Sequence, residues 1–210
     1  LFYSIESLGI GQVMIDSEKK SLVNGINDEE YTQILNSSGR ILGDIYRYNA
    51  APFEHKMIKS YFEILPLRRY IIKVAERYQV DSAHLGDSIW NSIVIDSRHL
   101  SGILNLSKLR LRFSDDEDVA FKCSECRTVH LHFSGGVCKT CGNYLSDQDE
   151  VLAKNIWEEN FYATQLVGEE DPIRMRCEEL TGQTDNQLER QRLFKGIITG
   201  GTKVADEIDL

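Results

Sequence analysis

No apolar run in this 210-residue sequence approaches the roughly 20 residues that a membrane-spanning helix requires. The first residues also lack the basic-then-apolar pattern of a secretory leader. Cysteine is scarce, with five residues of which four are clustered. That usage fits a reducing compartment and metal chelation better than a secreted disulfide framework. We therefore expect a cytoplasmic protein that makes no contact with a membrane.

Positive charge is also in short supply. Lys and Arg number 24 against 33 Asp and Glu, which gives a net charge of -9. A free-standing, sequence-independent nucleic-acid binder is normally basic, so that class is disfavoured, although a basic stripe on an acidic body stays possible. Residues 200–203 (GGTK) are not a phosphate loop, because the Walker pattern requires lysine before Ser or Thr. No ATP site is visible in the chain, and we assign no catalytic residue.

The first half of the chain has the apolar spacing of helices. The clearest case is residues 67–79, where Leu67, Tyr70, Ile71 and Val74 recur on one face. Further helices are expected to begin near Asp28, at Pro52, and after a cap at Asp81 or Ser82. We assign the apolar faces of all these helices to the protein core and give them no chemical role.

The apolar period changes after Ser107. Residues 108–113 (KLRLRF) alternate strictly, which predicts a half-buried strand. Residues 114–118 form an acidic turn, and residues 119–122 are expected to return as the second strand of a hairpin. This hairpin would lead directly into Cys123.

Four cysteines follow the spacing C-x2-C-x11-C-x2-C, namely Cys123, Cys126, Cys138 and Cys141. Each C-x2-C pair can wrap around one side of a metal ion, and two such knuckles supply the four thiolates of a tetrahedral zinc site. Gly142 follows the second pair, where the knuckle turn favours a residue without a Cβ atom. Alternating residues 129–133 and the pair Gly135-Gly136 predict a short hairpin between the knuckles. The pattern therefore predicts a zinc ribbon with Zn²⁺ as its cofactor.

Other interpretations of the cysteines are weaker. A thioredoxin-like redox site needs one C-x2-C at the start of a helix, and a catalytic zinc site needs an open coordination position that four thiolates close. His130 and His132 are interpreted as surface residues of the hairpin, because four cysteines already saturate the ion. Cys177 stands apart in an apolar stretch and is expected to be a buried structural thiol.

Lys108, Arg110 and Arg112 share one face of the predicted strand that enters the ribbon. These residues are either an ordinary solvated face or a patch that contacts phosphates, and both interpretations stay open.

The last forty residues have the order strand, loop, helix, strand. Residues 173–177 alternate as a strand, and residues 181–185 form a turn. Thr184 with Gln187 makes a capping box for a helix that continues to about Ile197. Residues 204–210 lead into another strand, so the segment is one unit of an α/β domain.

This segment resembles the second RecA-like half of superfamily-two DEAD/DEAH-box helicases. Leu180-Thr181-Gly182 is similar to the loop of that family, and Arg190 and Phe194, with Gly196 or Gly200, are similar to its R-x-x-x-F-x-x-G helix. The resemblance is closer to the very large helicases of bacterial anti-phage defence systems such as Druantia and DISARM. It rests on VHLH between the C-x2-C pairs, EELTGQTD at 178–185 and ERQRLF at 189–194, and it covers about residues 108–210.

The resemblance implies an ATP-dependent translocase on DNA, with ATP and Mg²⁺ bound by parts of a longer parent protein outside this sequence. The loop residues Thr181, Gly182 and Gln183 would then lie near the nucleic-acid track, although a structural turn explains Gly182 equally well. DNA and other subunits of a defence complex would be the partners. The chain would be an internal piece of that parent.

The expected fold is α+β, with a mostly helical region at 1–105, a β-hairpin and zinc ribbon at 106–146, a helix and linker at 147–171, and a partial RecA-like segment at 172–210. Within 147–171 the helix is expected from Asp149 to about Gln165. Two other functions stay open. One is a self-standing zinc-ribbon adaptor for nucleic acid or protein, and the other is a thiol oxidoreductase.

Overall fold

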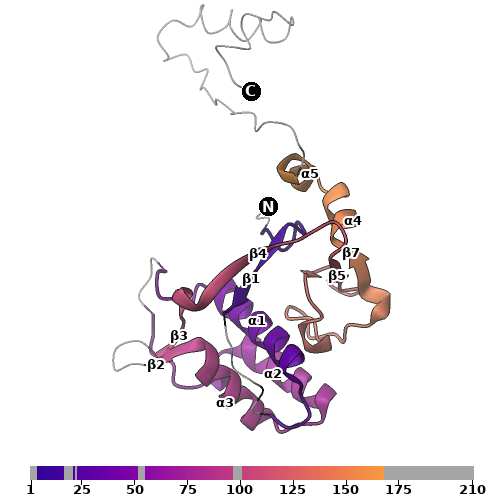
Figure 1. Ribbon diagram of the computed structural model, residues 1–210. Coiled ribbons are helices and arrows are strands. Elements are labelled where there is room, and N and C mark those ends of the chain that lie inside the picture. The colour runs from indigo at the N-terminus through magenta and orange to yellow at the C-terminus, as the bar shows by residue number, and fades with distance from the viewer. Residues whose placement is uncertain (1–3, 17–20, 22, 52–54, 97–100, 168–210) are drawn as a thin grey trace, which may run out of the picture. The chain divides into compact units, whose positions relative to one another are not determined.

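The computed structural model describes residues 4–16, 21, 23–51, 55–96 and 101–167. They belong to one compact unit that ends at Val167. Helices and small antiparallel sheets both contribute to this unit (Figure 1), so the expected α+β class is confirmed. The predicted RecA-like segment at 172–210, with Cys177 and the loop of Thr181, Gly182 and Gln183, lies outside the described residues.

Three helices build the centre of the unit: α1 (Asp28–Asp44), α2 (Leu65–Tyr78) and α3 (Ser82–Ile93). Helix α1 begins with a capping box in which the Asn27 side chain accepts the Glu30 N–H at 2.9 Å and the Glu30 carboxylate accepts the Asn27 N–H at 3.0 Å. The helix thus begins at Asp28, near the expected position, and Asn27 is its cap. Asp81 caps α3 by accepting the His84 N–H at 2.7 Å, as predicted.

The apolar faces of these helices meet in the main core. Its fully buried side chains include Tyr31, Ile34, Leu35, Leu42, Leu67, Tyr70, Ile71, Leu85, Ile89 and Ile93. The predicted helix at 67–79 is confirmed as α2. Pro66 lies in its first turn, where the missing N–H group of proline costs no hydrogen bond because the first N–H groups of a helix have no partner within it. Helix α2 ends as Gln79 turns into the left-handed region at φ 55°.

The helix predicted to begin at Pro52 is wrong over the described residues. Residues 55–60 have no regular structure, and only the 3-10 turn η1 (Tyr61–Glu63) follows them. Side chains from elsewhere take the backbone carbonyls that a helix would use. The buried Arg47 guanidinium donates to Lys56 O at 3.0 Å, and Ser101 Oγ donates to Ile58 O at 2.8 Å. Tertiary contacts therefore override the local spacing.

The strands form three small antiparallel sheets. The first pairs β1 (Gly11–Ile15) with β4 (Leu109–Phe113), and the second pairs β2 (Val94–Asp96) with β3 (Ser101–Leu104). The third has the order β6-β5-β7, from β5 (Val119–Lys122), β6 (Val129–His130) and β7 (Glu150–Leu152). Strands β1, β2 and β3 lie within the region that was expected to be mostly helical.

The predicted hairpin of residues 108–113 with 119–122 is wrong, because β4 pairs with β1 while β5 pairs with β6 and β7. The Ile15 N–H donates to Asn36 Oδ1 of α1 at 2.8 Å, which holds β1 on the helical core. Strand β4 follows β1 outward from Leu109, and its other four residues are exposed rather than half-buried. A 3-10 turn, η2 (Leu106–Lys108), precedes it.

The single helix expected over 149–165 is also replaced by shorter elements. The 3-10 turn η4 (Asp147–Asp149) leads into β7, and then come α4 (Ala153–Glu158) and α5 (Phe161–Val167). Asn160 interrupts the helical run, because its Oδ1 accepts the Tyr162 and Ala163 N–H groups and starts a new helix.

Candidate metal centre

The first cysteine pair lies in the turn that follows strand β5. The Cys123 N–H donates to Thr128 O at 3.0 Å, and the Arg127 N–H donates back to Cys123 O at 2.8 Å. Arg127 adopts φ 63°, so the turn reverses tightly behind the cysteines. The Asp149 carboxylate accepts the Ser124 N–H at 2.9 Å, which ties this knuckle to η4.

The second pair lies in a similar turn. The Cys138 N–H donates to Asn143 O at 2.8 Å, and the Gly142 N–H donates to Cys138 O at 2.9 Å. Gly142 has φ 79°, in the left-handed region that side chains disfavour, which agrees with the expected need for glycine after the knuckle. A bridge between Val137 and Tyr144 closes the base of the turn.

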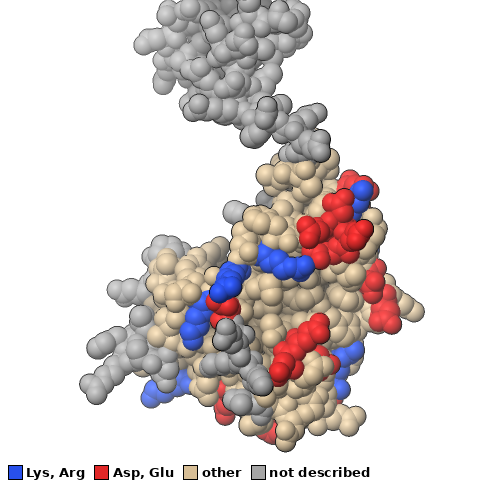
Figure 2. All heavy atoms as spheres, in the orientation of Figure 1, with Lys and Arg blue, Asp and Glu red and all other residues tan. Residues whose placement is uncertain are grey.

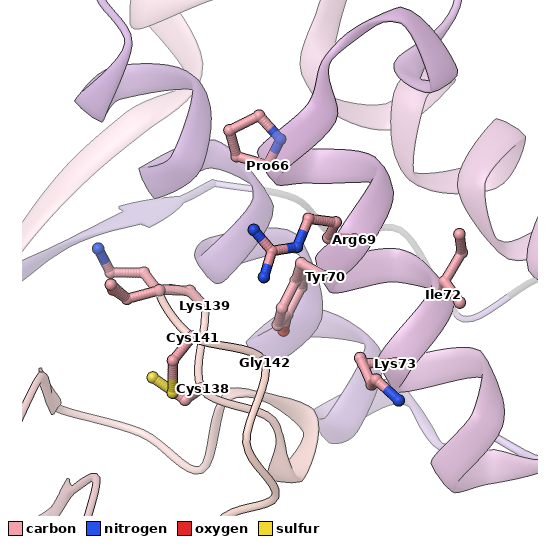
Figure 3. A pocket seen from close by; sticks show the side chains of 10 residues that line it. Pro66, Arg69, Tyr70, Ile72, Lys73, Cys138, Lys139, Cys141 and Gly142 are labelled. Carbon is pink, nitrogen blue, oxygen red and sulfur yellow. The ribbon is translucent and has the colours of Figure 1, made fainter. Parts of the chain in front are cut away.

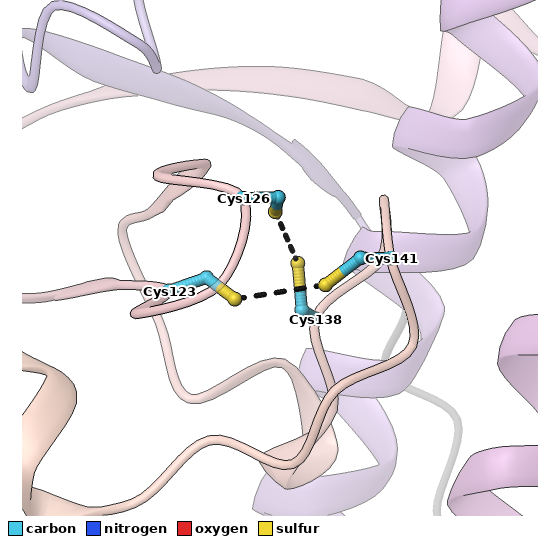
Figure 4. A group of neighbouring side chains, drawn as sticks. All are labelled: Cys123, Cys126, Cys138 and Cys141. Carbon is cyan, nitrogen blue, oxygen red and sulfur yellow. Dashed lines mark hydrogen bonds between the residues drawn. The ribbon is translucent and has the colours of Figure 1, made fainter.

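The two knuckles bring the four cysteine side chains together (Figure 4), and all four sulfur atoms lie within 4.8 Å of one another. Sγ–Sγ distances are 3.6 Å for Cys123–Cys141 and 3.5 Å for Cys126–Cys138. A tetrahedral zinc site with Zn–S bonds of about 2.3 Å has sulfur–sulfur edges of about 3.8 Å. A disulfide needs about 2.05 Å. The donor set therefore fits a four-coordinate metal such as zinc and forms no disulfide.

The four thiols lie so close together that a bound cation would favour their ionised form. Burial raises the pKa of the Cys138 thiol well above its usual range, and burial also raises the pKa of Cys141. Burial opposes ionisation of Cys126 as well, but contacts with Thr128, whose Oγ1 lies 3.1 Å from the sulfur, lower the Cys126 pKa to about 7. Several adjacent buried thiols cannot all ionise beside one another, whereas a bound divalent ion makes the thiolates favourable.

The interpretation of His130 as a surface residue is wrong. It was expected on a hairpin surface, but the predicted hairpin of 129–133 is reduced to the two-residue strand β6, and the His130 side chain is fully buried. Its Nε2 lies 3.3 Å from Cys138 Sγ. Burial lowers the pKa of His130 to about 3, so the ring is neutral and Nε2–H can donate to the sulfur. The sequence gives no sign of this role, because the alternating VHLH pattern places both histidines on one apparent outer face.

His132 is partly buried and bonded to the backbone, where the sequence predicted a surface residue. Its Nδ1 accepts the Ser134 N–H at 2.9 Å, and burial lowers its pKa to about 4. The acceptor role of Nδ1 places the ring proton on Nε2. His132 thus orders the backbone that leads into the 3-10 turn η3 (Ser134–Gly136).

Turn η3 fastens the cysteine cluster to the helices. Burial raises the pKa of Tyr70, which stays protonated and donates its hydroxyl hydrogen to Ser134 O at 2.9 Å. The Ser37 and Ser134 hydroxyls lie 2.6 Å apart, and Arg77 donates to Gly136 O at 3.2 Å. At Gly135 a Cβ atom would lie 2.6 Å from Ile34, so only glycine permits this approach to α1.

A salt-bridge network strengthens the same contact. Lys139, between the second pair of cysteines, pairs with Asp44 of α1 at 2.7 Å, and its side chain is only 8% exposed. Arg40 joins Asp44 to the buried Glu6, with Nε–O distances of 3.2 and 3.1 Å. The metal centre is therefore packed into the helical core and is not a separate module.

Of the basic residues proposed for phosphate contact, Arg110 and Arg112 lie in β4, and both have acidic partners. Arg110 pairs with Asp16 at 2.6 Å, and Arg112 pairs with Asp118 at 2.8 Å. In Figure 2, blue basic and red acidic side chains lie next to one another over the position of strand β4. Lys108 is exposed at the end of η2, one residue before the strand. Pairing reduces the net positive charge that this face offers to a phosphate.

Comparison with protein-family models, with curated proteins and with solved structures gives no match. Among the described residues, no helix is both long and apolar enough to cross a membrane.

Proposed function

We propose that this chain is a zinc-binding accessory region, with part of a motor, from an ATP-dependent DNA helicase or translocase of bacterial anti-phage defence. The observation that carries the zinc part is the convergence of four cysteine sulfurs within 4.8 Å. The helicase part rests on the resemblance at residues 178–185 and 189–194. In the parent protein, ATP and Mg²⁺ would be bound outside this chain.

The proposed role of the metal is structural. Four thiolates complete the tetrahedral coordination sphere of a zinc ion and leave no position for water or substrate. Zinc would fix the second knuckle, and through Lys139 and η3 it would fix helices α1 and α2 as well. A rigid accessory region of this kind can hold its position while an adjoining motor opens and closes.

DNA is the proposed nucleic-acid partner of the parent protein. In this chain alone we expect weak binding, because phosphates must compete with Asp16 and Asp118 for Arg110 and Arg112. Binding through Lys108 and these arginines should weaken steeply as salt rises. The loop of Thr181, Gly182 and Gln183 would contribute only within the assembled motor.

The zinc part is tested by metal analysis of the purified chain. We expect one zinc per chain in the wild type and almost none in the Cys123→Ser, Cys126→Ser double variant, because two thiolates cannot hold the ion tightly. Inductively coupled plasma mass spectrometry measures both. Cys177→Ser, outside the cluster, is the matched control and should keep its zinc. Equal zinc in the double variant and the wild type would refute the assignment.

The motor part is tested in the parent protein encoded by the native gene. We expect DNA-stimulated ATP hydrolysis there and none from this chain alone. Substituting the Walker lysine of the parent should abolish hydrolysis, while the double cysteine variant should reduce it. A reading frame without Walker and arginine-finger motifs would instead favour the alternative, a self-standing zinc-ribbon adaptor that binds nucleic acid or a protein partner.

A further inference from the structure

The four cysteine ligands differ in how far solvent reaches them. Cys123 and Cys138 are buried, whereas Cys126 and Cys141 are partly exposed. A small reagent that arrives from solvent will therefore meet Cys126 or Cys141 before the other two sulfur atoms. These two residues belong to different knuckles, so their surroundings determine which of them reacts more readily.

Cys126 lines a polar cavity of about 320 Å³ at the first knuckle. The segment before β1 contributes Ser4 and Ser7 to its wall, and the knuckle contributes Arg127 and Thr128. A polar cavity of this size admits water and molecules of similar size. Thr128 Oγ1 lies 3.1 Å from Cys126 Sγ, so a hydroxyl group stands directly beside the sulfur. This hydroxyl can donate a hydrogen bond to an oxygen atom that reacts there.

Two of the cations that line this cavity already have acidic partners. Arg40 pairs with Glu6 at 3.1 Å, and Lys139 pairs with Asp44 at 2.7 Å. The thiolates of a zinc centre would add negative charge behind Cys126. The cavity therefore suits a small uncharged polar molecule better than an anion.

Cys141 has different surroundings. It borders a second cavity, of about 260 Å³, between the second knuckle and helix α2, where Pro66 and Ile72 form apolar parts of the wall (Figure 3). Among the described residues, no hydroxyl group contacts Cys141 Sγ in the way that Thr128 contacts Cys126 Sγ. Of the two partly exposed ligands, Cys126 is therefore the better placed to react with a polar reagent.

We propose that Cys126 is a modification site for hydrogen peroxide and that its oxidation releases the metal. Cys126 Sγ attacks one peroxide oxygen, so that an S–O bond forms while the O–O bond breaks and the second oxygen leaves as hydroxide. The sulfur is oxidised to a sulfenic acid, and the peroxide is reduced. The Thr128 hydroxyl donates a hydrogen bond to the departing oxygen.

Cys138 completes the reaction. Its Sγ lies 3.5 Å from Cys126 Sγ (Figure 4) and attacks the sulfenic sulfur, so that an S–S bond forms, the S–O bond breaks and hydroxide leaves. In total, two thiolates, one hydrogen peroxide and two protons give one disulfide and two waters. Only Cys123 and Cys141 then remain as ligands, and two thiolates hold zinc too weakly to retain it. This inference rests on the proposed zinc centre.

The test follows zinc release and disulfide formation in the same samples. The zinc-loaded Cys177→Ser chain, in which only the four ligands can be oxidised, is treated with hydrogen peroxide and quenched with catalase. Absorbance of 4-(2-pyridylazo)resorcinol reports free zinc. Trypsin places the cluster on three peptides, 123–127, 128–139 and 140–154. Mass spectrometry should show peptide 123–127 joined through Cys126 to peptide 128–139, at the rate at which zinc appears.

Substitutions identify the reactive ligand. Thr128→Val removes the hydroxyl and should slow zinc release about 3- to 10-fold, the usual effect of one hydrogen bond. Thr140→Val makes the same change in the second knuckle and should leave the rate unchanged. Cys126→His retains a zinc ligand that forms no disulfide, so it should keep its zinc in peroxide. Cys141→His should still release zinc.

Metal analysis before the peroxide treatment separates this inference from the zinc assignment. A reduced chain without zinc would refute the metal centre and this inference with it. With zinc present, the inference alone is overturned if peroxide leaves the ion bound, or if the first disulfide joins peptide 123–127 to peptide 140–154. Equal rates of zinc release from Thr128→Val and Thr140→Val would also overturn it.

Discussion

His130 places a neutral hydrogen-bond donor beside a sulfur atom in the interior of the protein. With Nε2 3.3 Å from Cys138 Sγ, the ring can stabilise thiolate charge without adding a positive charge of its own. Hydrogen bonds to ligand atoms from outside the coordination sphere commonly tune metal affinity. The cysteine ligands could be predicted from their spacing alone, whereas His130 could not, because its role depends on how the chain between the knuckles folds.

We predict that His130→Ala lowers zinc affinity about 10- to 100-fold, the usual effect of losing such a partner. Competition with a chromogenic chelator such as 4-(2-pyridylazo)resorcinol measures the change. His132→Asn is the matched control, because asparagine retains an acceptor for the Ser134 N–H. If both variants bind zinc as tightly as the wild type, the hydrogen bond to sulfur is unimportant.

Two glycines in the helices differ in how tightly the surrounding atoms are packed. At Gly43, near the end of α1, an added Cβ atom would meet nothing within 4 Å. At Gly86 in α3, it would lie 2.2 Å from the ring of the buried Tyr61. The same residue type thus leaves open space in one helix and permits close packing in another, and the sequence does not distinguish the two.

We predict opposite effects for two alanine substitutions. Gly43→Ala should stabilise the protein by about 0.5–1 kcal/mol, through helix propensity and a less flexible unfolded chain. Gly86→Ala should destabilise it by about 1–3 kcal/mol, because Tyr61 must move. Urea denaturation followed by circular dichroism measures both. Similar changes in the two variants would contradict the packing described here.

At the level of elements, the spacing of apolar residues predicts a helix correctly where the helix buries one regular face. It fails where residues distant in the sequence determine the structure. Helix α2 could be predicted from Leu67, Tyr70 and Ile71 alone. The pairing of β4 could not, because β1 lies about a hundred residues earlier in the sequence. Likewise, nothing near residues 55–60 shows that Arg47 takes one of their carbonyl groups.

The whole described unit depends for part of its packing on the turns that carry the candidate metal site. Residues of η3 and the second knuckle contact Ser37 and Asp44 of α1 and Tyr70 and Arg77 of α2. Zinc that binds only the folded chain stabilises it by about 4 kcal/mol at a thousandfold excess over its Kd. Loss of the metal should therefore lower the stability of the helices as well.

We predict that removing zinc with a chelator lowers the melting temperature of the helical signal and the ribbon together. Differential scanning calorimetry should show a single transition for residues 1–167 that moves to lower temperature, because η3 and the second knuckle are bonded to α1 and α2. Restoring zinc should restore the transition. An unchanged helical transition, with only a small separate event lost, would mean that the ribbon is independent of the helices.

The segment before β1 packs against helices α4 and α5 at the end of the described unit. The Trp157 indole N–H donates to Gly9 O at 2.6 Å, and Leu8 packs with Ala153 and Ala163. During synthesis, Leu8 and Gly9 must therefore wait for almost 150 further residues before these contacts exist. Until then the newly made chain leaves Leu8 without its partners. Efficient production of this unit should therefore depend on chaperones that shield the segment around Leu8 until α4 and α5 have been made.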